Sequence, residues 1–273
     1  MKNLILFLVC TFLFSADDKA PSQRTRDRDV DIHHIKIDIT VDLEKKSVSG
    51  NVTHTLSALN SSLSEFALDA EDMEIHRARL NGKDISYNHH GDKVFLSLYK
   101  PIGWDDTVKV RLDYTAHPRI GTFFIEPDSV YPGKPWQAWT QGEDTDNHHW
   151  VPIYDYPNDK ATFETILTVD KKFKAISNGE LISLKDNKNG THTWHWHEHF
   201  PMVSYLISYV IGEFEKVEDS YNGIPVNYWV YDENKKEALR SFGLTPDMMK
   251  YFGDVTGVEY PYEKYDQIIV DDF

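Results

Sequence analysis

The residues best suited to chemistry gather in one segment of this 273-residue chain, Trp139–Lys160. The segment reads WTQGEDTDNHHWVPIYDYPNDK and combines two tryptophans, two adjacent histidines, a run of carboxylates and a proline turn. Titratable, polar and aromatic side chains in this density are typical of a binding or catalytic site rather than of a hydrophobic core. We therefore expect a functional site here, and we ask first whether its histidines bind a metal.

The two adjacent histidines of this segment, His148 and His149, lie beside Asp144 and Asp146. Imidazole and carboxylate groups are common metal ligands, which makes a metal site a natural hypothesis. On a strand, however, adjacent residues point to opposite faces, so the pair cannot easily chelate one ion. We predict that both histidines are structural or surface groups.

A second group of histidines occupies alternate positions of a predicted strand and is the better metal candidate. Alternate residues of a strand share one face, and histidines in this arrangement can bind zinc. The candidates are His195, His197 and His199. Chance binding of metal at an exposed strand is the alternative. Trp194 and Trp196, on the opposite face, are predicted to lie in the core, although an aromatic strand face can also stack sugars.

None of the common catalytic motifs is complete in this sequence. A helix-borne zinc peptidase site needs H-E-x-x-H, and the chain has no such motif. The nearest run, His197–His199, is followed by Pro201, through which a helix could not continue. The chain also has no P-loop, no G-x-G-x-x-G and no G-x-S-x-G motif. The residues alone therefore define no complete catalytic constellation.

Strands are predicted to position the Trp139–Lys160 segment, because apolar residues alternate with polar ones through most of the chain. The sequence Asn81-Gly82 predicts a two-residue hairpin turn, since both positions of that turn need positive φ. Short strands with regular turn signals predict an antiparallel sandwich or saddle. The continuous apolar run Tyr205–Ile211 predicts a strand covered on both faces. The clearest alternating stretches are 35–43, 48–56, 94–98, 108–112, 163–169 and 226–230.

The pattern changes near the end of the chain. Glu233–Phe242 carries apolar residues at helical spacing, and Thr245-Pro246 predicts the capping residue and first position of a second helix. Tyr260-Pro261-Tyr262 is expected to break that helix. A strand is expected to begin at Ile268.

The N-terminus predicts export. Residues 1–16 combine one lysine, a short apolar run and Ala16, as a secretory signal peptide does, and the run is too short to span a bilayer. Residues 17–31 are polar and charged and predict a solvated linker. The only cysteine, Cys10, lies inside the signal, so the exported chain would carry no disulfide. We expect a secreted or periplasmic protein with no membrane contact beyond an uncleaved signal anchor.

The charge of the chain argues against nucleic acid as a partner. Acidic residues outnumber basic ones by 44 to 29, which gives a net charge of −15 at neutral pH. Such a field repels a phosphate backbone.

Four segments together give the chain a resemblance to a known family. They are Trp139–Glu143, Tyr156–Lys160, Phe200–Leu206 and Tyr260–Asp266. In these segments the chain resembles the N-terminal half of the aminopeptidase N family of zinc peptidases, which includes leukotriene-A hydrolase. The resemblance covers residues 30–273.

The resemblance implies a mainly β fold. An antiparallel saddle-like β-sandwich is expected over residues 32–230, followed over residues 231–273 by the first helices and strand of a thermolysin-like α/β catalytic domain. In the family that strand ends in an acidic-Phe dipeptide, and the G-x-M-E-N and H-E-x-x-H motifs come after it. Asp271-Asp272-Phe273 matches this point, so the chain is expected to be truncated before those motifs.

The resemblance also implies roles for two residues. Glu143 matches the glutamate that binds the free α-amine of the substrate, and Gln141 matches a residue beside the pocket for the first side chain. A carboxylate that pairs with an ammonium group limits cleavage to the first residue, because an internal peptide offers no such charge. Gly142, between them, is smaller than the residue that many relatives carry there.

We therefore expect the substrate-anchoring N-terminal domain of an exported zinc aminopeptidase. Its partners would be peptides, held by their free N-terminus, and the missing catalytic domain. Zinc is implied for the full-length family enzyme, but none is expected in this chain, which should be inactive alone. The alternatives are a non-catalytic saddle domain that binds peptides or proteins, and a carbohydrate-binding sandwich that uses Trp136, Trp139, Trp194 or Trp196.

Overall fold

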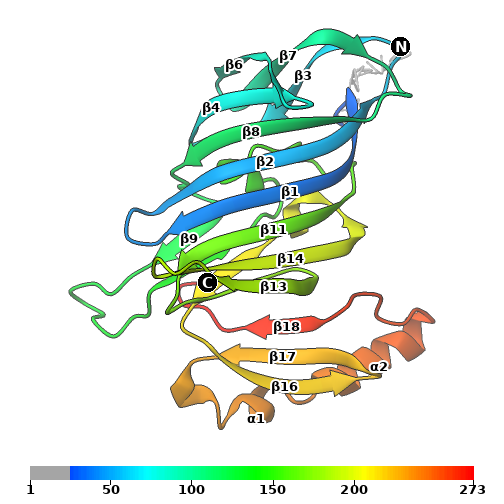
Figure 1. Ribbon diagram of the computed structural model, residues 1–273. Coiled ribbons are helices and arrows are strands. Elements are labelled where there is room, and N and C mark those ends of the chain that lie inside the picture. The colour runs from blue at the N-terminus through cyan, green and yellow to red at the C-terminus, as the bar shows by residue number, and fades with distance from the viewer. Residues whose placement is uncertain (1–24) are drawn as a thin grey trace, which may run out of the picture.

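The computed structural model describes residues 25–273 (Figure 1). The predicted signal peptide, residues 1–16, lies outside the described residues, as does most of the predicted linker 17–31. The last residues of that linker are built into the fold. Arg26 pairs with Asp69 at 2.6 Å, and the first strand already begins at Val30.

The largest element is an eight-stranded sheet with the order β13-β14-β11-β1-β2-β8-β4-β5. Its neighbours pair antiparallel except β1 and β11, which are parallel. In the inner strands of this sheet alternate side chains are buried because one face covers the core, whereas every residue of the two outermost strands, β13 and β5, is exposed. The strands are β1 (Val30–Asp42), β2 (Ser47–Ala58), β4 (Met73–Leu80), β5 (Lys83–Asp84), β8 (Val108–Ala116), β11 (Ala161–Asp170), β13 (Glu180–Asp186) and β14 (Thr191–Met202).

Two smaller sheets share a core with the large sheet. One has the order β3-β7-β6, with β3 (Leu63–Asp69), β7 (Lys93–Ile102) and β6 (Ser86–His90). The other has the order β12-β15-β10-β9, with β12 (Lys174–Ser177), β15 (Tyr209–Gly212), β10 (Gln137–Thr140) and β9 (Thr122–Ile125). One continuous cluster of buried apolar side chains joins all three sheets. This is the mainly β, sandwich-like fold that was predicted.

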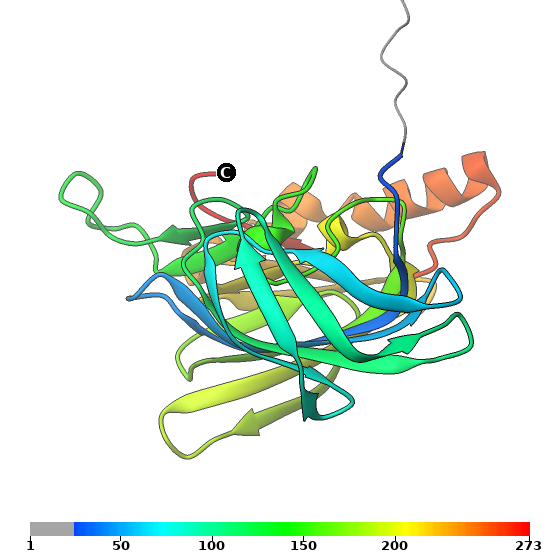
Figure 2. The same cartoon turned by 90° about the horizontal axis from the view of Figure 1, so that it is seen from above.

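The remaining sheet and both α-helices come after β15 and have a small core of their own. The sheet has the order β16-β17-β18, with β16 (Glu215–Tyr221), β17 (Ile224–Val230) and β18 (Tyr265–Ile268), and the helices are α1 (Ala238–Phe242) and α2 (Thr245–Thr256). In Figure 2 the large sheet is a bowed layer, and α2 and the C-terminus lie on the same side of it. The expected domain boundary between residues 230 and 231 would separate β17 from β18, which pair with each other. The boundary itself stays a prediction; along the chain, the change from one sheet to the next falls between β15 and β16.

Several expected elements have different bounds in the structure. The run Tyr205–Ile211 is not one strand: a 3-10 helix, Ser204–Leu206, precedes β15. The helix expected from Glu233 begins only at Ala238. The strand expected to begin at Ile268 ends there instead.

The second predicted helix forms, but its ends are set by other residues than those expected. Thr245 is the first residue of α2 rather than its cap, and its hydroxyl donates to the carbonyl of Phe242 at 2.7 Å. Gly257, with a φ of 70°, ends the helix before the Tyr260-Pro261-Tyr262 sequence is reached. Glycine adopts this left-handed conformation without a steric penalty, which explains the stop.

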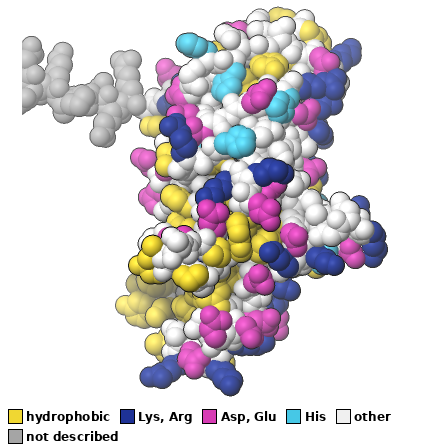
Figure 3. Space-filling model, turned by 90° about the vertical axis from the view of Figure 1, so that its left-hand side faces the viewer, with side chains coloured by type: hydrophobic (Ala, Val, Ile, Leu, Met, Phe, Trp, Pro, Cys, Tyr) yellow, Lys and Arg dark blue, Asp and Glu magenta, His cyan; other side chains and the backbone are white. Residues whose placement is uncertain are grey.

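The outer surface of α2 is rich in apolar side chains, although it also carries the exposed Lys250–Asp254 ion pair. Exposed large hydrophobic side chains gather on and beside this helix. They include Leu244, Met248, Tyr251, Phe252, Val255 and Val258. The face drawn in Figure 3, the left-hand side of Figure 1, also carries hydrophobic side chains, concentrated in its lower half. Within residues 25–273 no helix combines the length and hydropathy needed to cross a membrane.

Candidate functional site

The predicted site residues Gln141 and Glu143 lie in the loop after β10. Both side chains are exposed, and the loop is attached to the turn before β9 by a hydrogen bond from the Gln141 amide to the carbonyl of Gly121, at 3.1 Å. The structure therefore places an unburied carboxylate and an amide side chain two residues apart at the end of a short strand. An exposed carboxylate in such a loop can accept hydrogen bonds from an ammonium group without first breaking an internal ion pair.

The loop is held from beneath by Asn147, which is fully buried. Its Nδ2 donates to the carbonyls of Ser204 and Ile207 at 2.7 and 3.0 Å, and its Oδ1 accepts from the indole N–H of Trp150 at 2.8 Å. These bonds also explain the 3-10 turn at Ser204–Leu206, because they fix both of its ends. Asn147 is a positioning residue that the sequence reasoning missed, since the two carbonyls that its Nδ2 contacts lie 57 and 60 residues away in sequence.

Asn147 also explains why the residue between Gln141 and Glu143 is glycine. A Cβ built at Gly142 would lie 2.6 Å from Oδ1 of Asn147, well inside contact distance. The backbone of the loop therefore packs directly on the buried amide. The small side chain noted in the sequence is a packing requirement of this loop.

Strand β10 also contacts the end of the chain. The indole N–H of Trp139 donates to the carbonyl of Asp271 at 3.1 Å, and its ring lies 5.5 Å from that of Phe273. The Asp271 amide donates to Oε1 of Gln137 at 3.0 Å. Residues 271–273 are thus held beside the strand that leads into the Gln141–Glu143 loop.

A partly buried chain of hydrogen bonds reinforces this junction. Nε2 of Gln137 donates to the hydroxyl of Tyr231 at 2.8 Å, and that hydroxyl donates to Oδ1 of Asp271 at 2.5 Å. Burial, together with the bond to the Asp271 carboxylate, raises the pKa of Tyr231 above its ordinary value. The phenol therefore stays protonated and keeps its donor role at physiological pH.

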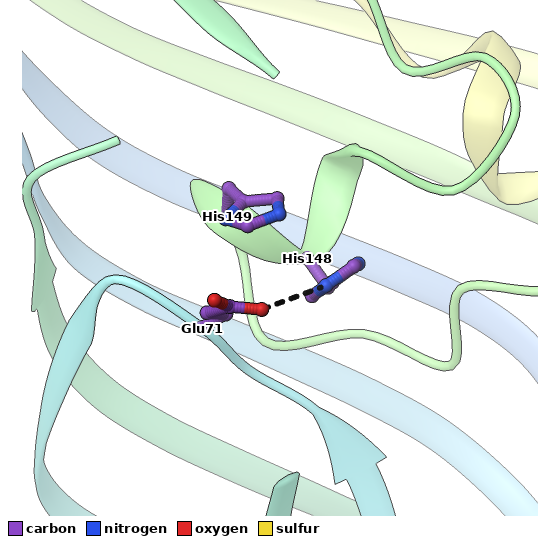
Figure 4. Close-up of side chains that lie close together, drawn as sticks. All are labelled: Glu71, His148 and His149. Atoms are coloured by element: carbon purple, nitrogen blue, oxygen red, sulfur yellow. Dashed lines mark ion pairs between the residues drawn. The ribbon is translucent and has the colours of Figure 1, made fainter. Parts of the chain in front are cut away.

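The structure brings His148 and His149 together, contrary to the reasoning from strand geometry. They lie on a 3-10 helix, Asn147–His149, and not on a strand, so their rings pack 4.4 Å apart. Burial lowers the pKa of His148, but the hydrogen bond and charge of Asp155 outweigh it, so this pKa lies above the ordinary value. Figure 4 shows the two rings beside the carboxylate of Glu71.

The alternate histidines of β14 are engaged elsewhere. His195 lies 2.6 Å from Oε2 of Glu164, which Lys36 also contacts at 2.8 Å. Burial raises the pKa of Glu164, but hydrogen bonds from Lys36 and His195 outweigh it and lower this pKa to about 2. The rings of His197 and His199 pack on each other, 3.9 Å apart. Among residues 25–273 only Glu71, His148 and His149 form a group of three or more residues with metal-ligating geometry, and the β14 histidines do not.

The four tryptophans considered for sugar stacking lie in or against the core. Trp139, Trp194 and Trp196 are buried, and Trp136 is partly buried against the same cluster. The prediction that Trp194 and Trp196 are core residues is confirmed. These indoles offer no exposed platform on which a sugar ring could stack.

The mainly β fold is the one found in the N-terminal domains of M1 peptidases. Residues 31–206 match the family described as the Peptidase M1 N-terminal domain, and the chain belongs to the M1 peptidase family. It is similar to leukotriene A-4 hydrolase of Xenopus laevis, with 25% identity over 264 residues, which cover 92% of this chain and 42% of that protein. Aminopeptidase 2 of Candida albicans is 22% identical over an alignment of 275 positions, which covers 96% of this chain and 29% of that protein.

Solved structures agree on the fold. An M1 zinc metallopeptidase from Deinococcus radiodurans superposes with a TM-score of 0.76 at 22% identity, covering 89% of this chain and 57% of that one. The chain thus spans less than two thirds of the length of the proteins it matches. Its sequence contains no H-E-x-x-H motif, so the residues present do not supply the helix-borne ligands of a peptidase zinc site.

Proposed function

We propose that this chain is the substrate-anchoring N-terminal part of an exported zinc aminopeptidase that removes N-terminal residues from peptides. In this proposal Glu143 binds the α-ammonium group of the peptide, and Gln141 lies beside the first side chain. The zinc, its ligands and the groups that activate water belong to a catalytic domain beyond this chain. The chain alone is therefore expected to hydrolyse no amino-acid anilide, with or without added zinc.

One observation carries the proposal: the loop that bears Gln141 and Glu143 begins where residues 271–273 meet β10. Trp139 contacts both Asp271 and Phe273, and Glu143 lies four residues after it. A segment that continued from this point would start beside Trp139 on β10, the strand that leads into the loop bearing Glu143. Substrate binding between the two parts would then place the amino end of a peptide at Glu143.

The apolar surface of α2 supports a protein neighbour. Phe252 and Val255 are 62% and 64% exposed, and isolated soluble domains rarely leave such side chains adjacent and uncovered. This surface also fits the second candidate function, a saddle domain without catalytic activity that binds peptides or another protein. The two functions differ in the sequence expected after residue 273.

The coding sequence downstream of the Phe273 codon discriminates between them. The aminopeptidase proposal expects an open frame that encodes G-x-M-E-N and then H-E-x-x-H. A stop codon directly after Phe273 would overturn that proposal and favour the binding module. The measurement needs no purified protein.

The role of Glu143 is tested in the protein that carries the catalytic domain. Glu143→Gln removes the charge but keeps the shape of the side chain. We expect kcat/KM on peptides with a free N-terminus to fall, and the fall corresponds to a loss of about 2–5 kcal/mol in transition-state stabilisation, because a desolvated ammonium group loses its charged partner. Glu44→Gln, at an exposed turn, is the matched control and should leave kcat/KM unchanged. Equal activity of wild type and Glu143→Gln would show that the amine is bound elsewhere.

Export is proposed from the N-terminal sequence. Expression of the complete coding sequence, followed by mass spectrometry of the mature N-terminus, should show loss of about the first 16 residues. An intact Met1 in protein recovered from the cytoplasm would refute this part.

A further inference from the structure

A group of side chains outside the Gln141–Glu143 loop has the composition of a metal site. Glu71 lies just after β3, and His148 and His149 lie on the 3-10 helix Asn147–His149 (Figure 4). The two segments are tied together because the Glu71 amide donates to the carbonyl of His148 at 3.0 Å. We call Glu71, His148 and His149 the His-pair cluster.

Both histidines of the cluster have Nδ1 directed at a carboxylate. His148 Nδ1 lies 3.1 Å from Oδ2 of Asp155, and His149 Nδ1 lies 2.9 Å from Oδ2 of Asp72. A carboxylate only accepts hydrogen bonds, so Nδ1 carries the proton in each ring and Nε2 of the neutral ring has a free lone pair. This carboxylate–histidine arrangement is the one that orients histidine ligands in metal sites.

The carboxylate behind His148 is itself held in place. The side chain of Asp155 is 1% exposed and accepts hydrogen bonds from the His148 amide at 3.0 Å and from the Ser204 hydroxyl at 2.7 Å. The imidazole of His148 is therefore oriented before any ligand arrives. Preorganisation of this kind reduces the entropic cost of binding.

The spacing within the cluster suits a bridging ion better than a direct hydrogen bond. Oε2 of Glu71 lies 3.8 Å from Nε2 of His148, which exceeds hydrogen-bond distance. Two ligands of a tetrahedral zinc ion, each about 2.0–2.1 Å from the metal, are about 3.3 Å apart. One ligand atom from each of the three residues already lies within 4.8 Å of the others, so small side-chain rotations would bring all three to an ion.

The surrounding charge favours a cation, with one competitor. Asp72 and Asp155 add two carboxylates to that of Glu71, whereas Arg119 places its guanidinium 2.7 Å from Asp72 and 3.4 Å from Glu71. The Arg119 side chain is 74% exposed and can move into solvent when a metal ion enters. Glu71 is partly exposed and leaves the cluster open to solvent on its side.

We propose that the His-pair cluster binds a divalent transition-metal ion, Zn²⁺ being the natural candidate, through His148, His149 and Glu71. Two imidazole ligands select zinc, nickel or copper rather than magnesium or calcium. The ion links the segment after β3 to the 3-10 helix that contains Asn147. It thereby stiffens the base of the Gln141–Glu143 loop.

The test uses the untagged chain, stripped with a chelator and titrated with ZnCl₂ by calorimetry and by thermal unfolding. We expect one zinc ion per chain, an increase in Tm with zinc and no effect of MgCl₂. Replacing the metal with Co²⁺ should give the visible absorption of a nitrogen- and oxygen-ligated ion. Absence of saturable zinc binding to the folded chain overturns the proposal.

Variants locate the site. Glu71→Gln, at a partly exposed position that does not threaten folding, and His148→Gln should each weaken zinc binding about tenfold or more. The control is the double variant His197→Ala, His199→Ala, which removes two histidines of β14 and should leave the zinc affinity unchanged. Loss of binding in that control, with normal binding in Glu71→Gln, would place the ion on β14 and refute the proposal.

A third variant is expected to bind zinc more tightly than the wild type. Arg119→Ala removes the cation that competes for Glu71 and Asp72, so zinc affinity should rise several-fold. A histidine pair that served only to brace the loop would show no zinc response in this variant. An unchanged or weakened affinity would contradict the assignment of Glu71 as a ligand.

Discussion

The buried amide of Asn147 is expected to be a principal support of the Gln141–Glu143 loop. In Asn147→Ala the carbonyls of Ser204 and Ile207 and the indole N–H of Trp150 lose their partner in the core. Each hydrogen bond contributes about 1 kcal/mol net, and a buried group left unpaired costs about 1–3 kcal/mol. Because three groups lose their partner, we expect the free energy of unfolding to fall by about 3–5 kcal/mol. This is large against the usual total stability of about 5–15 kcal/mol.

The loss is measured by urea unfolding of the chain, followed by circular dichroism and tryptophan fluorescence. Hydrogen exchange adds a local readout, because the amides of residues 142–149 should exchange faster in the variant. Asn88→Ala, at an exposed position of β6, is the matched control and should change stability by no more than about 0.5 kcal/mol. A change below about 1 kcal/mol for Asn147→Ala, with unaltered exchange, would show that the amide does not support the loop.

Three further predictions concern a buried histidine, the glycine of the loop and the phenol that binds Asp271. Burial lowers the pKa of His54 to about 4, so the stability that its neutral form provides is complete above about pH 6.5 and is lost as pH falls toward 4. The total loss in free energy of unfolding is about 3 kcal/mol. Urea unfolding from about pH 4 to 8 should therefore show a weaker dependence of stability on pH in His54→Gln than in the wild type. Gly142→Ala should cost about 1–3 kcal/mol in thermal unfolding, because its Cβ would collide with Asn147; an unaltered Tm would mean that the loop adjusts freely. Tyr231→Phe should speed amide exchange in residues 271–273 and lower stability by about 1–3 kcal/mol, and unaltered exchange would show that the phenol does not secure this segment.

Much of the fold was predictable because the information is local. Alternation of apolar residues is enough to define the strands β1, β2, β7, β8 and β11, since one face of each covers the core. Asn81-Gly82 forms the predicted turn with φ values of 49° and 82°, which few residue pairs tolerate. The saddle architecture and the membership in the M1 family are confirmed by the fold and by the family match.

The prediction failed where distant residues decide the local conformation. Tyr205–Ile211 has the composition of a strand, but the Asn147 amide binds carbonyls at both ends of its first turn and holds a 3-10 helix there. The pairing of β17 with β18 joins segments separated by two helices, and no periodicity in the sequence announces it.

The sequence by itself determined the strands, the turns, the apolar faces and the position of Gln141 and Glu143 in a polar segment, because those depend on neighbours along the chain. Only the tertiary structure decided that His148 and His149 face one another and Glu71, and that residues 271–273 lie beside β10. Such contacts depend on how separate elements pack. One-dimensional spacing cannot specify them, since the same residues would point apart on a strand and point together on a 3-10 helix.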